Sequence, residues 1–254
     1  MTDALRPALV AAVYLGTFMA ALSISIVSVA LPAIQADLRT DIAGLQWVVG
    51  AYALCLSAFM LSAGPIGDRY GRKLSWLCGV GLFTLGSLVC AVAPTLAVLI
   101  AGCALQGIAG AFLIPGALSI LSQAFPHPVE RAHIIGGWSS FSALSLILGP
   151  ILGGILVEST GWPSIFLINL PIGVITIGLG LWAIGESSHP DHAALDPWGQ
   201  ILSIVWLGAL TFGLISAGQI GWTAPHTLVG LGAAVLAFAL FMIVESRMAR
   251  PVLP

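Results

Sequence analysis

The chain has 254 residues, of which 59% are hydrophobic and 7% are charged, and its formal net charge is −2. Its mean hydropathy is +1.07. Soluble domains carry roughly 25% charged residues, so this composition excludes an ordinary soluble protein and indicates a polytopic membrane protein.

Eight apolar stretches have the length, or nearly the length, that a membrane span requires. A bilayer core about 30 Å thick takes roughly 20 apolar residues per helix. None of the stretches contains Asp, Glu, Lys, Arg or His. No ten-residue segment alternates as a β-barrel strand would, so we predict an all-α protein with eight transmembrane helices, the first ending next to Pro32. The helices cover residues 9–31, 45–63, 74–93, 96–121, 134–157, 165–184, 198–217 and 227–244.

The basic residues predict how these helices are oriented, because Lys and Arg that flank spans are retained on the cytoplasmic side. If the N-terminus lies inside, seven of the eight bases are cytoplasmic and only Arg39 is outside. We therefore predict a multi-pass protein of the plasma (inner) membrane with a cytoplasmic N-terminus. The seven bases are Arg6, Arg69, Arg72, Lys73, Arg131, Arg247 and Arg250.

Three further residue types add no specific chemistry. Seven of the eight tryptophans, including Trp76, fall near the ends of stretches, where an indole ring prefers the headgroup region. The five histidines lie in loops or at loop edges, with no zinc-site spacing. The four cysteines lie inside apolar stretches without close pairing, so we interpret them as small buried hydrophobes and expect neither a metal ion nor a cofactor. The cysteines are Cys55, Cys78, Cys90 and Cys103.

Residues 64–73 form the most informative segment, with one acid and three bases between two uncharged stretches. Gly71 adopts a positive φ at no steric cost, so a tight turn can present Asp68 beside Arg69 and Arg72. Asp68 can then accept hydrogen bonds or face a helix N-terminus, which stabilises a carboxylate by about 0.3 to 1 kcal/mol. We predict a breakable cytoplasmic latch, with an ordinary basic loop as the alternative. The latch residues are Gly64, Asp68, Arg69, Gly71, Arg72 and Lys73.

Glycine and proline recur along the first six helices. Gly64-Pro65 and Gly149-Pro150 are 85 residues apart, and Pro32 and Pro115 are 83 apart. This spacing indicates two units of three helices, which must be inverted relative to each other, as in transporters. In the fifth helix Gly149, Gly153 and Gly154 remove side chains from one stripe, so that a neighbouring backbone can approach, and Pro150 adds a kink.

Together these segments resemble the major facilitator superfamily, specifically the N-terminal part of its fourteen-helix drug/proton antiporter branch. Residues 64–73 fit the pattern G-x-x-x-D-R-x-G-R-K, and residues 26–32 and 169–173 are similar to the branch's first and sixth helices. Asp196 with Gly199 is similar to the start of its seventh helix. Its antiporter pattern in the fifth helix is matched by Gly136, Gly149, Pro150, Gly153 and Gly154, with Ser145 in place of a further glycine.

The resemblance implies a six-helix N-terminal bundle over residues 1–184, built from inverted three-helix repeats. Residues 185–254 would form a cytoplasmic linker and two additional transmembrane helices, and the family's C-terminal bundle is absent from this chain. The resemblance also implies that the glycine stripe of the fifth helix packs against the opposite half. Packing within one bundle is the alternative.

The sequence departs from the family pattern at two positions. Ser23 stands where many relatives have Asp, and Cys103 stands where the family usually has Arg, shortly before a Gln-Gly pair. A charge within the membrane is expensive and normally functional, so both losses remove a proton-handling pair. The remaining polar groups are predicted either to line a cavity or to join helices by hydrogen bonds. These groups are Ser23, Ser25, Gln46, Gln106 and Asn169.

The function implied by the resemblance is secondary active export of small, amphipathic, drug-like molecules by alternating access, present here as a truncated N-terminal part. The alternative is a transport-inactive, half-length membrane protein that acts as a structural or regulatory partner subunit. An enzyme is not expected, because no His, Asp or Glu lies within a span and no catalytic constellation is apparent. The expected partners are the lipid bilayer, a small-molecule substrate, and a missing C-terminal half or partner subunit, but not nucleic acid.

Overall fold

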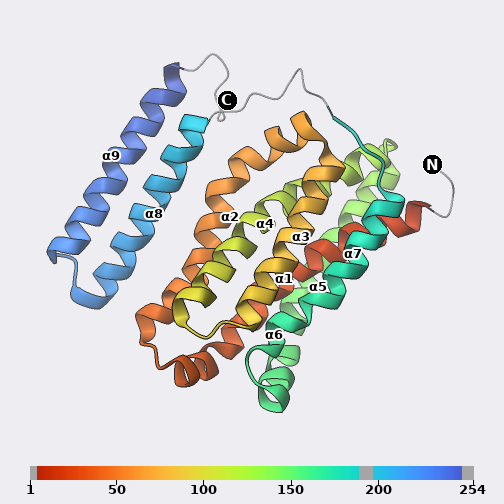
Figure 1. The fold of residues 1–254 in the computed structure, drawn as a ribbon. Coiled ribbons are helices and arrows are strands. Elements are labelled where there is room, and N and C mark those ends of the chain that lie inside the picture. Colours follow the sequence, from red (N-terminus) through yellow and green to blue (C-terminus); the bar gives the residue numbers. More distant parts are fainter. Residues whose placement is uncertain (1–4, 189–196, 248–254) are drawn as a thin grey trace.

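The structure is a computed structural model that describes residues 5–188 and 197–247. Asp196 and Arg250 therefore lie outside the described residues. Over the described ranges the chain is almost entirely helical (Figure 1), and eight segments are long and apolar enough to cross a membrane, which confirms the predicted all-α fold and its number of spans. The helices are α1 (Leu5–Leu38), α2 (Ile42–Tyr70), α3 (Arg72–Ala91), α4 (Leu96–Ala124), α5 (Pro128–Thr160), α6 (Ser164–Leu167), α7 (Asn169–Ala183), α8 (Pro197–Ile220) and α9 (Pro225–Arg247).

The first helix does not end at its proline as predicted. It continues through Pro32 to Leu38, because one missing backbone hydrogen bond is tolerated in a membrane helix. The chain turns only at Arg39, whose φ is +50°. The next helix then starts at a side-chain cap, in which Asp41 accepts a hydrogen bond of 2.9 Å from the Gly44 N–H.

The sixth predicted span is interrupted where one continuous helix was expected. It forms α6 and α7, with Ile168 between them. Pro171 has no N–H to donate to the carbonyl four residues earlier, which is that of Leu167, the last residue of α6. The interruption places Asn169 at the start of α7.

The helices α1 to α7 pack against one another, and α8 and α9 form a hairpin beside α2 (Figure 1). Within the first group α1 packs on α5 and α7, while α4 packs on α2 and α3. The hairpin is attached to α2 by Gln200, whose Nε2 donates a hydrogen bond of 2.8 Å to the Ala58 carbonyl. Ser62 also donates a hydrogen bond to the Gln200 side chain.

Trp76 of α3 lies in the core of the helix bundle, although the sequence placed it near the end of a span. Its side chain is 0% exposed. Three glycines on three other helices make room for the indole, because a Cβ at Gly16, Gly116 or Gly180 would lie 2.7, 3.0 or 3.2 Å from it. A helix end inside a bundle can therefore still face its neighbours, and the preference of Trp76 for the headgroup region remains a prediction.

The ends of α2 and α5 are alike. Gly71 and Gly161 follow these helices with φ values of +113° and +87°. The N–H of each glycine donates a hydrogen bond to the carbonyl four residues earlier. The distance is 3.0 Å from Gly71 to Gly67 and 3.1 Å from Gly161 to Val157. Gly221 follows α8 in the same way, with a φ of +94° and an N–H that donates to the Ala217 carbonyl at 3.1 Å. The likeness is therefore not specific to the two inverted three-helix units, which remain a prediction.

Candidate functional site

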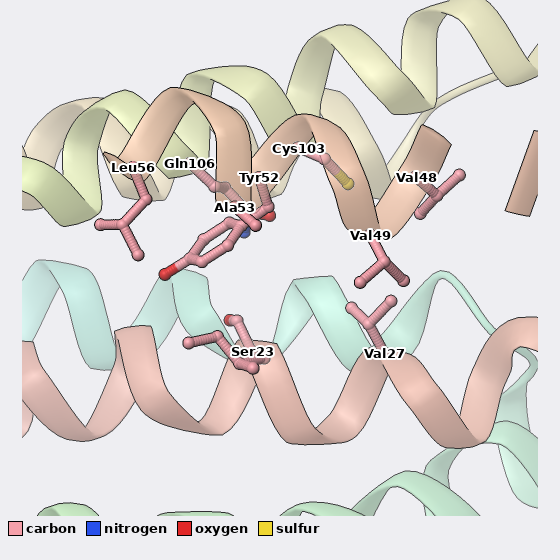
Figure 2. Close-up of a pocket in the computed structure, with 10 residues that line it drawn as sticks. Ser23, Val27, Val48, Val49, Tyr52, Ala53, Leu56, Cys103 and Gln106 are labelled. Carbon is pink, nitrogen blue, oxygen red and sulfur yellow. The ribbon is translucent and has the colours of Figure 1, made fainter. Parts of the chain in front are cut away.

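A cleft lies between α1 and α2, and α4 forms its back wall (Figure 2). Its volume is about 130 Å³. The side chains around it are mostly apolar, and polar atoms come from four of them: Ser23, Tyr52, Cys103 and Gln106. No charged residue lines it. The full lining is Ser23, Ile24, Val27, Val48, Val49, Tyr52, Ala53, Leu56, Cys103 and Gln106.

A buried hydrogen-bond network supports one side of this cleft and joins four helices. The Asn169 amide of α7 donates to Ser23 Oγ of α1 at 3.0 Å and to Ser87 Oγ of α3 at 3.2 Å. Gln106 Nε2 of α4 donates to the same Ser87 Oγ at 2.8 Å. Both amide hydrogens of Asn169 are therefore used, and the network fixes the positions of Ser23 and Gln106 on the cleft wall.

The structure brings together three of the five polar residues predicted to line a cavity. Ser23 and Gln106 line the cleft, and Asn169 lies behind them. Ser25 instead joins α1 to α5, because its Oγ donates to the Leu146 carbonyl at 2.8 Å. Gln46 lines a separate cleft at the α1–α2 connection, close to the end of α8. Their roles in function remain predictions.

Sequence reasoning missed Ser87 and Tyr52. Ser87 is 0% exposed and accepts two of the network's hydrogen bonds. A single serine in an apolar span carries no signal that separates this central position from an ordinary helix contact. Tyr52 did carry a signal, because a phenol in the middle of a span needs either a partner or a cavity.

Replacing Asn169 with leucine is expected to destabilise the protein, because Ser23 and Ser87 both lose a donor. Interhelical hydrogen bonds in membranes are worth about 0.6 kcal/mol on average, with a maximum near 1.7, so two of them predict a loss of roughly 1 to 2 kcal/mol. Thr176→Val is the matched control, because Thr176 Oγ1 is buried in α7 without a hydrogen-bond partner among the described residues. Thermal unfolding in detergent compares the two, and equal losses would contradict the network's importance.

The predicted latch lies at the corner between α2 and α3, where Gly71 makes the turn. Asp68 Oδ1 accepts a hydrogen bond of 2.7 Å from Arg72 Nε, and the two side chains are 33% and 21% exposed. Ion pairs near the surface contribute about 0.2 to 1 kcal/mol, so this partly exposed pair between two helices costs little to open. The sequence had suggested that Arg69 also joins this pair, but it does not. Its guanidinium carbon lies over the Tyr70 ring instead, 5.7 Å from the ring centroid. Gly64 lines a small pocket beside the pair.

The helix N-terminus at this corner is occupied by Glu186, a residue that sequence reasoning did not single out. Its carboxylate accepts the backbone N–H groups of Lys73 at 3.0 Å and Leu74 at 3.1 Å. The Arg72 N–H donates to the Ser187 carbonyl at 2.9 Å, and Lys73 Nζ donates to the Leu181 carbonyl at 2.9 Å. The segment that follows α7 is thereby fastened to the start of α3, and Asp68 does not occupy that position.

The four glycines of α5 that match the antiporter pattern divide into two groups. A Cβ on Gly149 would lie 2.5 Å from Ser25 Cβ, and one on Gly153 would lie 2.9 Å from Ile26 Cγ1. Both glycines therefore pack against α1 of the same bundle, and the expectation that they face an opposite half is wrong for them. Gly136 and Gly154 have no atom within 4 Å of such a Cβ, so they do not share this stripe. Pro150 lies inside the helix.

The two departures from the family pattern meet in one place. Ser23 and Cys103 line the same cleft from α1 and α4. An acid and a base at these positions would face one cavity, so the two substitutions together leave that cavity uncharged.

Comparison with known protein families decides the assignment. The family model described as "Major Facilitator Superfamily" matches residues 13–252. The chain belongs to the Major Facilitator Superfamily. Similar curated members are the multidrug resistance protein Stp of Mycobacterium tuberculosis, 42% identical over 94% of this chain, and the methylenomycin A resistance protein of Streptomyces coelicolor, 40% identical over 94%. The tetracenomycin C resistance and export protein of Streptomyces glaucescens is 38% identical over 96%.

These Major Facilitator Superfamily members are longer than the chain. The aligned part covers 44%, 50% and 45% of them, so the chain spans about half the length of the curated relatives it matches. A crystal structure of the POT family transporter PepTSo superimposes with a TM-score of 0.64, at 14% identity, over 95% of this chain and 52% of that one. This likeness confirms the transporter-type fold. The chain is thus an integral membrane protein of a transporter family, in agreement with the expectation that it is not an enzyme.

Proposed function

We propose that the chain forms the N-terminal part of a secondary active drug exporter of the fourteen-helix drug/proton antiporter branch. It would lie in the plasma membrane with its N-terminus in the cytoplasm and work by alternating access with a C-terminal half. The mostly apolar cleft between α1, α2 and α4, which is open to an organic molecule, is the observation that carries this proposal. Relatives named for resistance to several antibiotics support it.

The chemistry of the cleft suggests the substrate class. Apolar walls favour organic compounds with apolar surface. The polar residues Ser23 and Gln106 on the wall are only 4% and 1% exposed, so a substrate would make few hydrogen bonds there. A charged substrate would enter this half without a counter-charge, which is costly in a low-dielectric site. We therefore propose neutral, amphipathic small molecules as substrates.

The latch at the α2–α3 corner supports the alternating-access part of the proposal. Asp68 and Arg72 form a weak, partly exposed pair, and Glu186 holds the adjacent helix start. A contact that costs little to open suits a gate that must break and reform in each cycle.

Filling the cleft tests export directly. Ala53 lines the cleft and is exposed to it, so Ala53→Trp would occupy the cleft without displacing a buried side chain. We expect drug accumulation to rise to the level of cells without the exporter. Leu85→Trp is the control, because Leu85 of α3 is 52% exposed and does not line the cleft. If drug accumulation in cells with the Ala53→Trp variant stayed at the level of cells with the wild-type protein, the cleft would not be the substrate site.

A transport-inactive partner subunit is the second candidate. The observation that favours it is the meeting of Ser23 and Cys103 in one cleft, which leaves no charged side chain there to handle a proton. An immunoblot of native membranes separates the two candidates. A band near the 26.2 kDa of this chain supports the subunit, and a band of about twice that mass, as the relatives' length suggests, supports the exporter.

A further inference from the structure

Two cysteines that are 13 residues apart in sequence meet at the back of the cleft. Cys90 Sγ of α3 and Cys103 Sγ of α4 are 3.9 Å apart, and both thiols are free. The sequence had been interpreted as lacking any close pairing. The pair arises because α3 and α4 run side by side after a short connection, which no spacing rule for disulfides or zinc sites describes.

The close approach of the two helices fixes this pair. Gly102 leaves room for the Cys90 sulfur, since a Cβ there would overlap that atom, and a Cβ on Gly86 would lie 3.1 Å from the Gly102 carbonyl oxygen. Cys90 is 0% exposed, whereas Cys103 is 3% exposed and lines the cleft. Figure 2 shows the Cys103 side chain at the α4 wall. A ligand that enters the cleft therefore reaches Cys103 first and Cys90 behind it.

The separation of the two sulfurs suits one atom bound to both. Two sulfur bonds of about 2.3 Å span roughly 3.8 Å at a tetrahedral angle and roughly 3.4 Å at the narrower angle of a pyramidal, trivalent centre. A trivalent centre therefore requires the two thiols to move about 0.5 Å closer together than their 3.9 Å separation. Thiolates select soft, thiophilic centres. Among the described residues, no group of three or more His, Cys, Asp or Glu side chains gathers to hold a metal ion. A structural zinc ion needs four such ligands, so this pair fits a centre that needs only two protein sulfurs.

Charge disfavours one class of such centres. A monovalent soft cation bound by two thiolates would leave a net negative charge among apolar side chains, which is expensive. A trivalent arsenic atom with one organic substituent forms a neutral product with two thiols, and its organic group would lie against the apolar cleft wall. We propose that Cys90 and Cys103 form a dithiol binding site for monosubstituted trivalent organoarsenicals.

The binding step is balanced with phenylarsine oxide as the ligand. Two arsenic–sulfur bonds form and the arsenic–oxygen bond breaks. The two thiol protons go to that oxygen, which leaves as one water molecule. Arsenic stays trivalent and neither sulfur is oxidised, so no further reactant is needed. The site is a property of this chain and does not depend on the proposed export.

Phenylarsine oxide added to the purified protein in detergent tests the site. The intact mass of the protein should rise by the mass of one phenylarsine oxide minus one water. The adduct should resist washing with a monothiol and should be removed by 2,3-dimercaptopropanol. Cys90→Ser and Cys103→Ser should each lower the retained fraction at least tenfold. Cys55→Ser and Cys78→Ser are matched controls, and both variants should retain the arsenical adduct as the wild-type protein does. Retention in the Cys90/Cys103 double serine variant would overturn the proposal.

A second measurement does not depend on variants that fold. Proteolysis of the treated wild-type protein should yield one arsenic-linked pair of peptides that contains Cys90 and Cys103. A link between any other two cysteines, or the absence of a retained adduct, would refute the site. Tighter binding of silver or zinc ions than of the arsenical at the same two cysteines would overturn the assigned ligand class.

Discussion

Replacing Gly149 with alanine is expected to destabilise the protein by about 1 to 3 kcal/mol, the usual cost of overpacking a tight contact. The added Cβ would lie 2.5 Å from Ser25 Cβ and 3.1 Å from the Ile26 backbone nitrogen. Neither atom moves without shifting α1, because both are part of or next to its backbone. Thermal unfolding in detergent measures the loss.

Gly154→Ala provides the control on the same helix. A Cβ there meets no atom within 4 Å, and alanine is a better helix former than glycine by up to about 1 kcal/mol. We expect an unchanged or slightly higher unfolding temperature. If both variants lost the same stability, the contact between Gly149 and α1 would not be the cause.

Replacing Glu186 with alanine is expected to loosen the corner between α2 and α3. The carboxylate accepts two backbone N–H groups at the start of α3, and losing such a cap costs about 1 kcal/mol. Amides at Lys73 and Leu74 should then exchange with solvent roughly fivefold faster, if local opening governs exchange. Hydrogen exchange followed by mass spectrometry reports on these amides directly.

Two other variants separate the charge of Glu186 from its hydrogen bonds. Glu186→Gln keeps an acceptor oxygen but loses the favourable interaction of a negative charge with the helix N-terminus, so an intermediate exchange rate is expected. Glu158→Ala, a change to an exposed acid at the end of α5, should leave the rate unchanged. Identical rates in Glu186→Ala and the wild-type protein would show that the corner does not need this clamp.

Pattern in the sequence was sufficient for the membrane spans and for their number. Uncharged stretches of about 20 residues must form helices in a bilayer, because hydrocarbon offers no partner for backbone N–H and C=O groups. The turn at Gly71 was also predictable, since its surroundings of Asp68, Arg69 and Arg72 mark a loop between spans. Its φ of +113° agrees with that prediction.

The candidate site was predictable only in part. Gln106 and Asn169 stand out as amides in apolar spans, and both belong to the network at the cleft. Gln46 stands out equally but lies in another cleft. Ser87 and Cys90 do not stand out at all, because small polar or sulfur-containing side chains are common within helix bundles. Which face of each helix turns inward was the missing information.

The sequence by itself determined that this is a membrane protein with eight helical spans and a charged corner after the second, because hydropathy and charge act locally along the chain. Tertiary structure alone decided that Gly149 packs on α1, that Glu186 caps α3, and that Cys90 meets Cys103. Each of these contacts joins residues from different helices, and their occurrence depends on how the helices rotate and approach each other. With every span apolar on all sides, the hydrophobic pattern does not specify that rotation.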